Sequence, residues 1–182
     1  PKPNLLGIED EVPPFRLEAS QPVLSIEELE QLKQIDSLTQ NKFKSVVLDI
    51  TYEPEKDEDH GQKLNNALED ICKKANKAIN DGYNIIILSD RNTSNKKAAI
   101  PALLACSATH QHLVRSGNRT NVGLVIDTGS AREVHHFALL AGYGAEAICP
   151  WLAYETIKTL TDDFFTAQEN FIKAVGKGLF KV

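Results

Sequence analysis

The fold is decided by the stretch Val122-Gly-Leu-Val-Ile-Asp-Thr-Gly-Ser-Ala-Arg-Glu-Val-His-His-Phe-Ala-Leu-Leu-Ala-Gly-Tyr-Gly-Ala-Glu-Ala-Ile-Cys149. It opens with apolar residues on consecutive positions over 122–126, which is typical of a strand buried on both faces. A polar turn and a helical pattern over 131–140 follow, and Gly142-Tyr-Gly144 forms a structural turn into a second apolar run at 145–149. This order of strand, turn, helix and strand predicts a parallel α/β fold.

The same pattern recurs on both sides of that stretch. Short apolar runs predict strands at 45–50 and 85–88. The expected helices span 64–79, the segment from Pro101 to about Arg115, and 151–160. Four such strands require parallel pairing with right-handed crossovers. The expected fold class is therefore α/β, with βα repeats forming a partial or degenerate TIM-like barrel, although a small open sheet has the same local pattern.

The N-terminal part of the chain has a different composition. Residues 1–22 hold five of the eight prolines, which predicts an extended arm on the surface rather than a core element. Ser25 and Glu28 fit a capping box that opens a short helix to about Leu38. The predicted organisation is an arm with a short helix at 1–40, an α/β core at 41–160 and a helical tail at 161–182.

Composition narrows the class of protein. The net charge of −5 and pI near 5.6 argue against a general nucleic-acid binder. No apolar run approaches the ~20 residues that span a bilayer. Cys72, Cys106 and Cys149 lie in apolar segments without a C-x-x-C pair, so we expect reduced core thiols rather than a metal site. The chain contains no methionine and begins at Pro1, so we expect a segment of a longer protein.

Polar residues follow the ends of the predicted strands. In a parallel fold these loops gather at the carboxyl edge of the sheet, where ligands normally bind. The residues expected at this edge are Asp49, Ser89, Asp90, Arg91, Asp127, Thr128, Gly129 and Pro150. Asp127-Thr-Gly-Ser130 resembles an anion cradle at a helix start, but Ser130 acting as an ordinary N-cap explains the same residues.

Two further groups of polar residues have ordinary structural interpretations. The acidic stretch at 51–61 lacks the ligand spacing of a calcium loop and is interpreted as a solvated loop. Arg132 and Glu133 could pair with Asp90 or Arg91 across neighbouring loops and stabilise the fold. The sequence offers no serine or cysteine nucleophile with a suitable base.

The histidines do not form an obvious metal site. His110 and His112 are two residues apart on a helix, and His135 and His136 are adjacent, so neither pair can bind one metal ion jointly. His112 and His136 could meet across neighbouring helices. Hydrogen-bonded packing residues are the favoured interpretation for all four.

Several ordered strings resemble the central domain of the glutamate synthase large subunit. They are Leu88-Ser-Asp-Arg91, Ile100-Pro-Ala-Leu-Leu104, His110-Gln-His-Leu113, Arg119-Thr120, Ala131-Arg-Glu-Val-His-His-Phe-Ala-Leu139, Gly142-Tyr-Gly-Ala-Glu-Ala-Ile148 and Pro150-x-Leu-Ala153. The sequence departs from the family pattern at Gln111 and at Asp127-Thr-Gly-Ser130, where relatives have a third histidine and a Glu-Ser-Gly-Glu.

The resemblance implies a part of a large enzyme. The family transfers the amide ammonia of glutamine through an internal tunnel to 2-oxoglutarate, with FMN and an iron–sulfur cluster carrying the electrons. This domain would scaffold the amidotransferase and FMN-binding domains and help to wall the tunnel. The resemblance implies no catalytic, cofactor-binding or metal-binding residue here, because those groups lie elsewhere in the parent.

Partners and location follow from the same resemblance. The expected partners are those two domains, with a small subunit or ferredoxin for the parent enzyme, and no nucleic acid or membrane. The expected location is the cytoplasm or the plastid stroma. The alternative is a free-standing module that binds an anion or a phosphorylated ligand through the loops at the strand ends.

Overall fold

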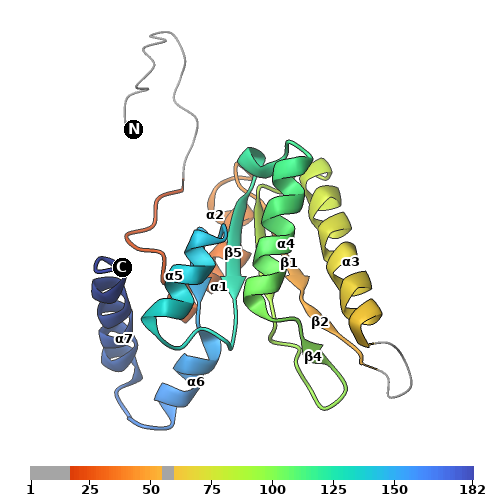
Figure 1. Ribbon diagram of the computed structural model, residues 1–182. Coiled ribbons are helices and arrows are strands. Elements are labelled where there is room, and N and C mark those ends of the chain that lie inside the picture. The colour runs from red at the N-terminus through yellow and green to blue at the C-terminus, as the bar shows by residue number, and fades with distance from the viewer. Residues whose placement is uncertain (1–16, 55–59) are drawn as a thin grey trace.

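The computed structural model describes residues 17–54 and 60–182 (Figure 1). The strands are β1 (Ser45–Asp49), β2 (Thr51–Tyr52), β3 (Ile85–Ser89), β4 (Ala98–Ala99), β5 (Gly123–Asp127) and β6 (Ala147–Cys149). The helices are α1 (Ile26–Lys33), α2 (Ile35–Leu38), α3 (His60–Asn80), α4 (Ala102–Arg115), α5 (Val134–Gly142), α6 (Trp151–Lys158) and α7 (Phe164–Leu179), with a 3-10 turn η1 (Arg119–Asn121).

The core of the molecule is a four-stranded parallel sheet. Its strands follow in chain order, β1-β3-β5-β6, and each pairs in parallel with the next. All five residues of β3 are buried, as the consecutive apolar pattern predicted for a central strand. The predicted α/β class with parallel strands is therefore confirmed.

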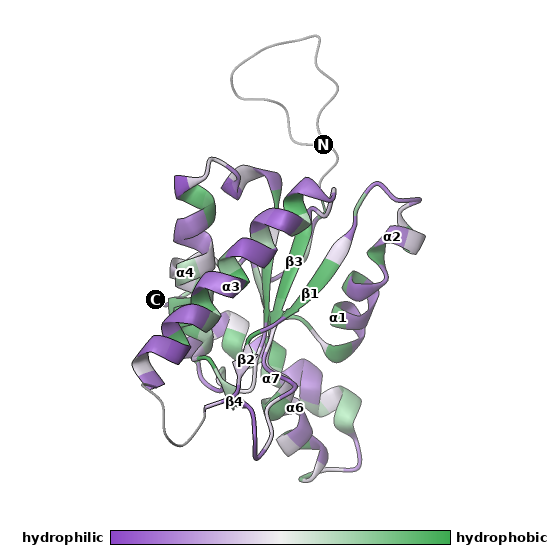
Figure 2. Cartoon of the chain, turned by 90° about the vertical axis from the view of Figure 1, so that its right-hand side faces the viewer, coloured by the Kyte–Doolittle hydropathy of each residue, from purple (hydrophilic) through white to green (hydrophobic). Residues whose placement is uncertain are grey.

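Helices cover both faces of this sheet. Helices α3, α4 and α5 lie on one face, and α1 with α2 lies on the other (Figures 1 and 2). Helix α3 buries Ile71, Cys72, Ala75 and Ala78 and leaves its polar side in solvent, as the helical spacing predicted. It begins at His60, four residues before the predicted start, because the pattern was counted from Leu64, its first apolar residue. Gly82, with φ of 86°, ends the turn after it as expected.

The residues that directly follow the predicted arm belong to the core. Val23 is 1% exposed and forms a parallel bridge with Ile148, which adds a further edge to the sheet beside β6. The Ile148 N–H donates to the Pro22 carbonyl at 2.7 Å, and the Leu24 N–H donates to the Ile148 carbonyl at 2.9 Å. Proline suits this position because an edge needs only its carbonyl. Residues 17–20 are exposed, as expected for an arm, and 1–16 lie outside the described residues.

The sequence patterns predicted some helix ends correctly and others incorrectly. The capping box is confirmed, since the Glu28 N–H donates to Ser25 Oγ and the Ser25 N–H donates to Glu28 Oε2. The predicted helix to Leu38 is broken at Gln34 into α1 and α2. Helix α5 begins at Val134 rather than near 131, so the interpretation of Ser130 as an N-cap is wrong.

Two short strands escaped the sequence analysis. Strands β2 and β4 pair antiparallel through Thr51 with Ala99 and Tyr52 with Ala98. Two residues are too few to display a period. Strand β2 also occupies the start of the acidic stretch that was interpreted as a loop, and residues 55–59 of that stretch lie outside the described residues.

Candidate functional site

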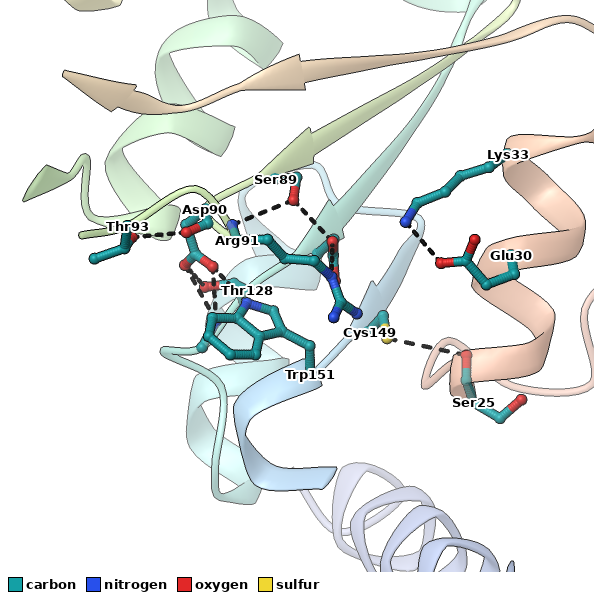
Figure 3. A network of polar contacts seen from close by, with 12 residues as sticks. Ser25, Glu30, Lys33, Ser89, Asp90, Arg91, Thr93, Thr128, Cys149 and Trp151 are labelled. Atoms are coloured by element: carbon teal, nitrogen blue, oxygen red, sulfur yellow. Dashed lines mark hydrogen bonds and ion pairs between the residues drawn. The ribbon is translucent and has the colours of Figure 1, made fainter. Parts of the chain in front are cut away.

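Asp90 lies at the centre of the carboxyl edge of the sheet. Its carboxylate accepts hydrogen bonds from Thr128 Oγ1 at 2.6 Å, from the Gly129 N–H at 3.0 Å and from Trp151 Nε1 at 2.6 Å (Figure 3). The side chain is 3% exposed. These donors come from the loop after β5 and from the start of α6, so one carboxylate ties together the ends of three neighbouring strands.

The predicted anion cradle is thus filled by a residue of the same chain. The Gly129 N–H donates to Asp90, and the Ser130 N–H donates to Thr128 Oγ1 at 3.0 Å. A Cβ at Gly129 would lie 3.2 Å from the Trp151 ring, so glycine permits the close approach of this loop to α6. The turn carries the backbone donors that its sequence suggested, but they serve an internal anion.

Arg91 and Asp127 form a second polar contact at this edge. Arg91 Nε donates to Asp127 Oδ2 at 2.7 Å, and Ser89 Oγ donates to the same oxygen at 2.8 Å. The Arg91 guanidinium lies over the Trp151 ring, 5.4 Å from its centroid. Burial alone would lower the pKa of Arg91, but its bond and charge interaction with Asp127 raise it overall.

Asp49 lies at the outer strand of the same edge. It accepts bonds from the Thr51 N–H, from Thr51 Oγ1 and from Asn92 Nδ2. Burial would raise the pKa of its carboxyl group, but these bonds hold the pKa below its ordinary value. Pro150 adjoins the edge by preceding α6. The structure therefore brings together the predicted edge residues, and they bond mostly to one another.

Other predicted contacts are not formed. Arg132 and Glu133 do not pair with Asp90 or Arg91, because Asp90 and Arg91 are engaged within the edge network. Glu133 instead lies 3.3 Å from His136 Nε2, one turn along α5.

Three of the four histidines, His110, His112 and His136, make hydrogen bonds within the fold, as favoured, whereas His135 is exposed. His112 Nε2 bonds with Asn76 Nδ2 at 2.7 Å, while His136 Nδ1 accepts from the Arg132 N–H. They contact different elements and do not meet. Within the described part of the chain, no three His, Cys, Asp or Glu side chains are grouped so as to hold a metal ion.

At the opposite, amino end of the strands, Arg119 makes a cluster that sequence reasoning missed. Its guanidinium donates to the carbonyls of Val122 and Gly144, to His110 Nδ1 and to Glu146 Oε1, at 2.7 to 3.0 Å. Its side chain is 16% exposed. Arg119 was noted only as part of a string that resembles the family, because no local pattern predicts an arginine whose partners include Gly144 and Glu146, which lie 25 and 27 residues further along the chain.

A cavity of about 1210 Å³ opens at this amino end. It is lined by residues 17–22, by one side of α1 and by the first residues of β3, β5 and β6. His110 and Arg119 form part of its wall. Sequence reasoning directed attention to the carboxyl edge and gave no reason to expect a large cavity here.

The three cysteines are buried free thiols, as predicted. Burial raises the pKa of all three, to about 11 for Cys106. A thiol with a raised pKa is a poor nucleophile near neutral pH. In residues 17–54 and 60–182, no helix is long and apolar enough to cross a membrane.

The fold has a counterpart among solved structures. A double mutant of flavocytochrome b2 with pyruvate bound aligns with a TM-score of 0.52 at 13% sequence identity, over 86% of this chain and 48% of that one. At this identity the likeness concerns the fold alone.

Sequence comparison is more specific. The chain is 37% identical to a glutamate synthase [NADH] of Schizosaccharomyces pombe over its whole length, which is 9% of that protein. It is 39% identical to the glutamate synthase [NADPH] large chain of Bacillus subtilis, over 92% of this chain and 11% of that one. A chloroplastic ferredoxin-dependent glutamate synthase of rice is 39% identical over 90% of this chain and 11% of the relative.

The chain therefore spans about a tenth of the length of these relatives. The sequence profile of the glutamate synthase central domain matches residues 1–182, all of the chain. The chain belongs to the glutamate synthase central domain family.

Proposed function

We propose that this chain is the central linking domain of a glutamate synthase, an oxidoreductase that converts glutamine and 2-oxoglutarate into two molecules of glutamate. It scaffolds the amidotransferase and FMN-binding domains of the parent and contributes wall to the ammonia route between them. The observation that carries the proposal is the carboxyl edge of the sheet, where the polar groups of Asp90, Thr128 and Gly129 bond to one another. An edge bonded in this way favours a structural role over chemistry.

The cofactors and electron donor belong to other parts of the parent. FMN and the iron–sulfur cluster are assigned to the domains that flank this one. The relatives are named for NADH, NADPH and ferredoxin, so a nicotinamide nucleotide, through a small subunit, or ferredoxin supplies the electrons.

The architecture supports a half-barrel origin. Strands in chain order with α3, α4 and α5 on one face are the arrangement of consecutive βα units in a TIM-like barrel. In this proposal α1 and α2, which lie in the N-terminal part at 1–40, cover the face that a complete barrel would turn inward. Residues 41–160 are the core, and 161–182 lead toward the FMN-binding domain.

The first test uses the isolated 182-residue chain. Titration with FMN, followed by flavin fluorescence, and an assay of ammonia release from glutamine should both give no signal above buffer. Tight flavin binding or glutamine hydrolysis by the isolated chain would contradict the proposal.

The second test uses the complete parent enzyme. A substitution that loosens this domain, such as Asp90→Ala, should lower the glutamate formed per glutamine hydrolysed, with free ammonia released into solution. Equal loss of both activities would point to general unfolding, and an unchanged ratio would argue against a part in the ammonia route.

The rival function, a free-standing anion-binding module, has weaker support. Its cradle already donates to Asp90, so an external phosphate would have to displace a buried carboxylate. Thermal stabilisation of the isolated chain by inorganic phosphate, at constant ionic strength, would favour the rival.

A further inference from the structure

Two buried polar atoms of the carboxyl edge lack a hydrogen-bond partner among the described residues. They are Asp127 Oδ1 and Arg91 Nη2. Asp127 is fully buried, and its other oxygen accepts from both Arg91 Nε and Ser89 Oγ. One orphan is an acceptor and the other is a donor, on two side chains that already bond to each other. Buried polar groups are rarely left unsatisfied, so this pair calls for a partner.

The two side chains do not satisfy these atoms directly. The Nε and Nη2 edge of a guanidinium normally grips both oxygens of a carboxylate. Here only the Nε bond forms, at 2.7 Å. Each group is held by another neighbour, since Ser89 Oγ holds the carboxylate and the Trp151 ring lies against the guanidinium (Figure 3). Trp151 is itself fixed by its bond to Asp90.

Neighbouring side chains do not satisfy these two atoms either, although the Cys149 thiol interacts weakly with the Arg91 guanidinium. The Cys149 thiol lies close to the guanidinium, but sulfur is a weak acceptor and its S–H donates to the Ser25 carbonyl at 3.9 Å. Across the edge, Glu30 of α1 pairs with Lys33 at 2.7 Å.

We propose that one water molecule binds between Arg91 and Asp127, accepting from Nη2 and donating to Oδ1. Water fits this position because one of the two unsatisfied atoms is a donor and the other is an acceptor. A metal cation would serve Oδ1 but repel the guanidinium, and an anion would serve Nη2 but repel the carboxylate. Water does both, and bridging waters commonly complete polar contacts that are too long to bond directly.

The direct test is a crystal structure of the chain at a resolution that resolves ordered water. The expected result is one water within hydrogen-bonding distance of both Nη2 and Oδ1. A direct second bond between those two atoms, or empty density between them, overturns the proposal.

Ser89→Ala provides a sharper test. Without the serine hydroxyl the carboxylate of Asp127 is free to turn, so both of its oxygens should grip the Nε and Nη2 edge and the water should be expelled. Thr93→Ala is the matched control, because Thr93 Oγ1 bonds the Asp90 carbonyl nearby and should leave the water in place. A water retained in Ser89→Ala contradicts the proposed cause of its binding.

A solution measurement covers the case in which Ser89→Ala fails to fold. In the unmodified chain, rotating-frame NMR should show a cross-peak between the Arg91 guanidinium protons and a long-lived water. Its absence, with the Arg91 signals otherwise resolved, counts against the site.

Discussion

Each end of the sheet is stabilised by one charged residue, and the two residues have opposite charges. At the carboxyl edge, a buried anion, Asp90, collects donors from the loops after two neighbouring strands. At the amino end, a cation, Arg119, collects the carbonyl oxygens of Val122 and Gly144. The difference agrees with the direction of the helices, because each βα unit brings helix N-termini to one end and helix C-termini to the other. Free N–H groups gather at the first end and need acceptors, while free carbonyls gather at the second and need donors.

Removing the anion at the carboxyl edge should have the largest effect. Asp90→Ala leaves Thr128, Gly129 and Trp151 with unpaired donors, and bonds to a charged acceptor are worth about 1.5–3 kcal/mol each, so we expect a loss of roughly 5 kcal/mol. Urea unfolding measures this loss.

Formate offers a way to test whether the site is an anion site. It should restore part of the Asp90→Ala stability by occupying the vacated position, whereas chloride at equal ionic strength should not. Asp90→Asn, which keeps the volume filled, should gain nothing from formate. Equal responses to both salts would contradict this interpretation.

The amino end should be nearly as sensitive to a single methyl group. Gly144 has φ of 111°, and a Cβ there would overlap the His110 ring. Gly144→Ala should therefore cost about 3 kcal/mol, from backbone strain together with overpacking.

Gly82→Ala isolates the backbone part of that cost. Gly82 also has positive φ, at 86°, but nothing lies within 4 Å of the position that a Cβ would take there, so a loss of about 1 kcal/mol is expected in urea unfolding. Equal losses at the two glycines would remove His110 from the explanation.

A milder change at the carboxyl edge tests the indole bond alone. Trp151→Phe keeps a ring near Arg91 but removes the N–H that donates to Asp90, and should cost about 2 kcal/mol. Thermal unfolding of Trp151→Phe beside Thr93→Ala, which loses a bond to the Asp90 carbonyl instead, measures the difference. A larger loss of stability in Thr93→Ala than in Trp151→Phe would contradict the stabilising role that we assign to the bond between Trp151 and Asp90.

The smallest expected effect near neutral pH comes from the buried thiol near the amino end, whose contribution to stability changes only above pH 9. Burial raises the pKa of Cys106 from 9.0 to about 11, so the folded state holds its proton in a range where the unfolded chain releases it. Stability is therefore unaffected below pH 9 and falls as the pH rises from 9 toward 11, by up to about 1.4 kcal/mol per pH unit for this group.

Cys106→Ser provides the control for that dependence. Serine does not ionise in this range, so the unfolding free energy of the variant should fall less steeply between pH 9 and 11 than that of the unmodified chain. The remaining slope belongs to groups such as Cys149 and Tyr154, whose pKa values burial also raises. An unchanged slope would contradict the assignment to Cys106.

Much of the fold was predictable because its strands and helices follow from the spacing of apolar residues close together in the sequence. Consecutive apolar residues identified β3 and β5, and the spacing of Ile71 and Ala75 identified α3. The predicted loops do meet at the carboxyl edge, since strand direction alone determines where they gather.

The parts that were missed depend on distant partners. Ser130 had the letters of an N-cap, but the helix starts later because the loop N–H groups turn to Asp90 and Thr128. Arg119 donates to the carbonyl of Gly144, 25 residues further along the chain, and Val23 pairs with Ile148 of β6. The residues around Arg119 and Val23 in the sequence do not indicate these partners.

The bridge of Val23 to β6 has a consequence for the order of folding. Its neighbour Leu24 accepts a bond from the Tyr154 hydroxyl, 130 residues further along the chain. Contacts of such sequence separation form slowly, because a long loop must close before they bring any gain. During synthesis this segment leaves the ribosome before β6 and α6 do, yet it would be among the last parts of the sheet to reach its final place, because it must wait for both of them.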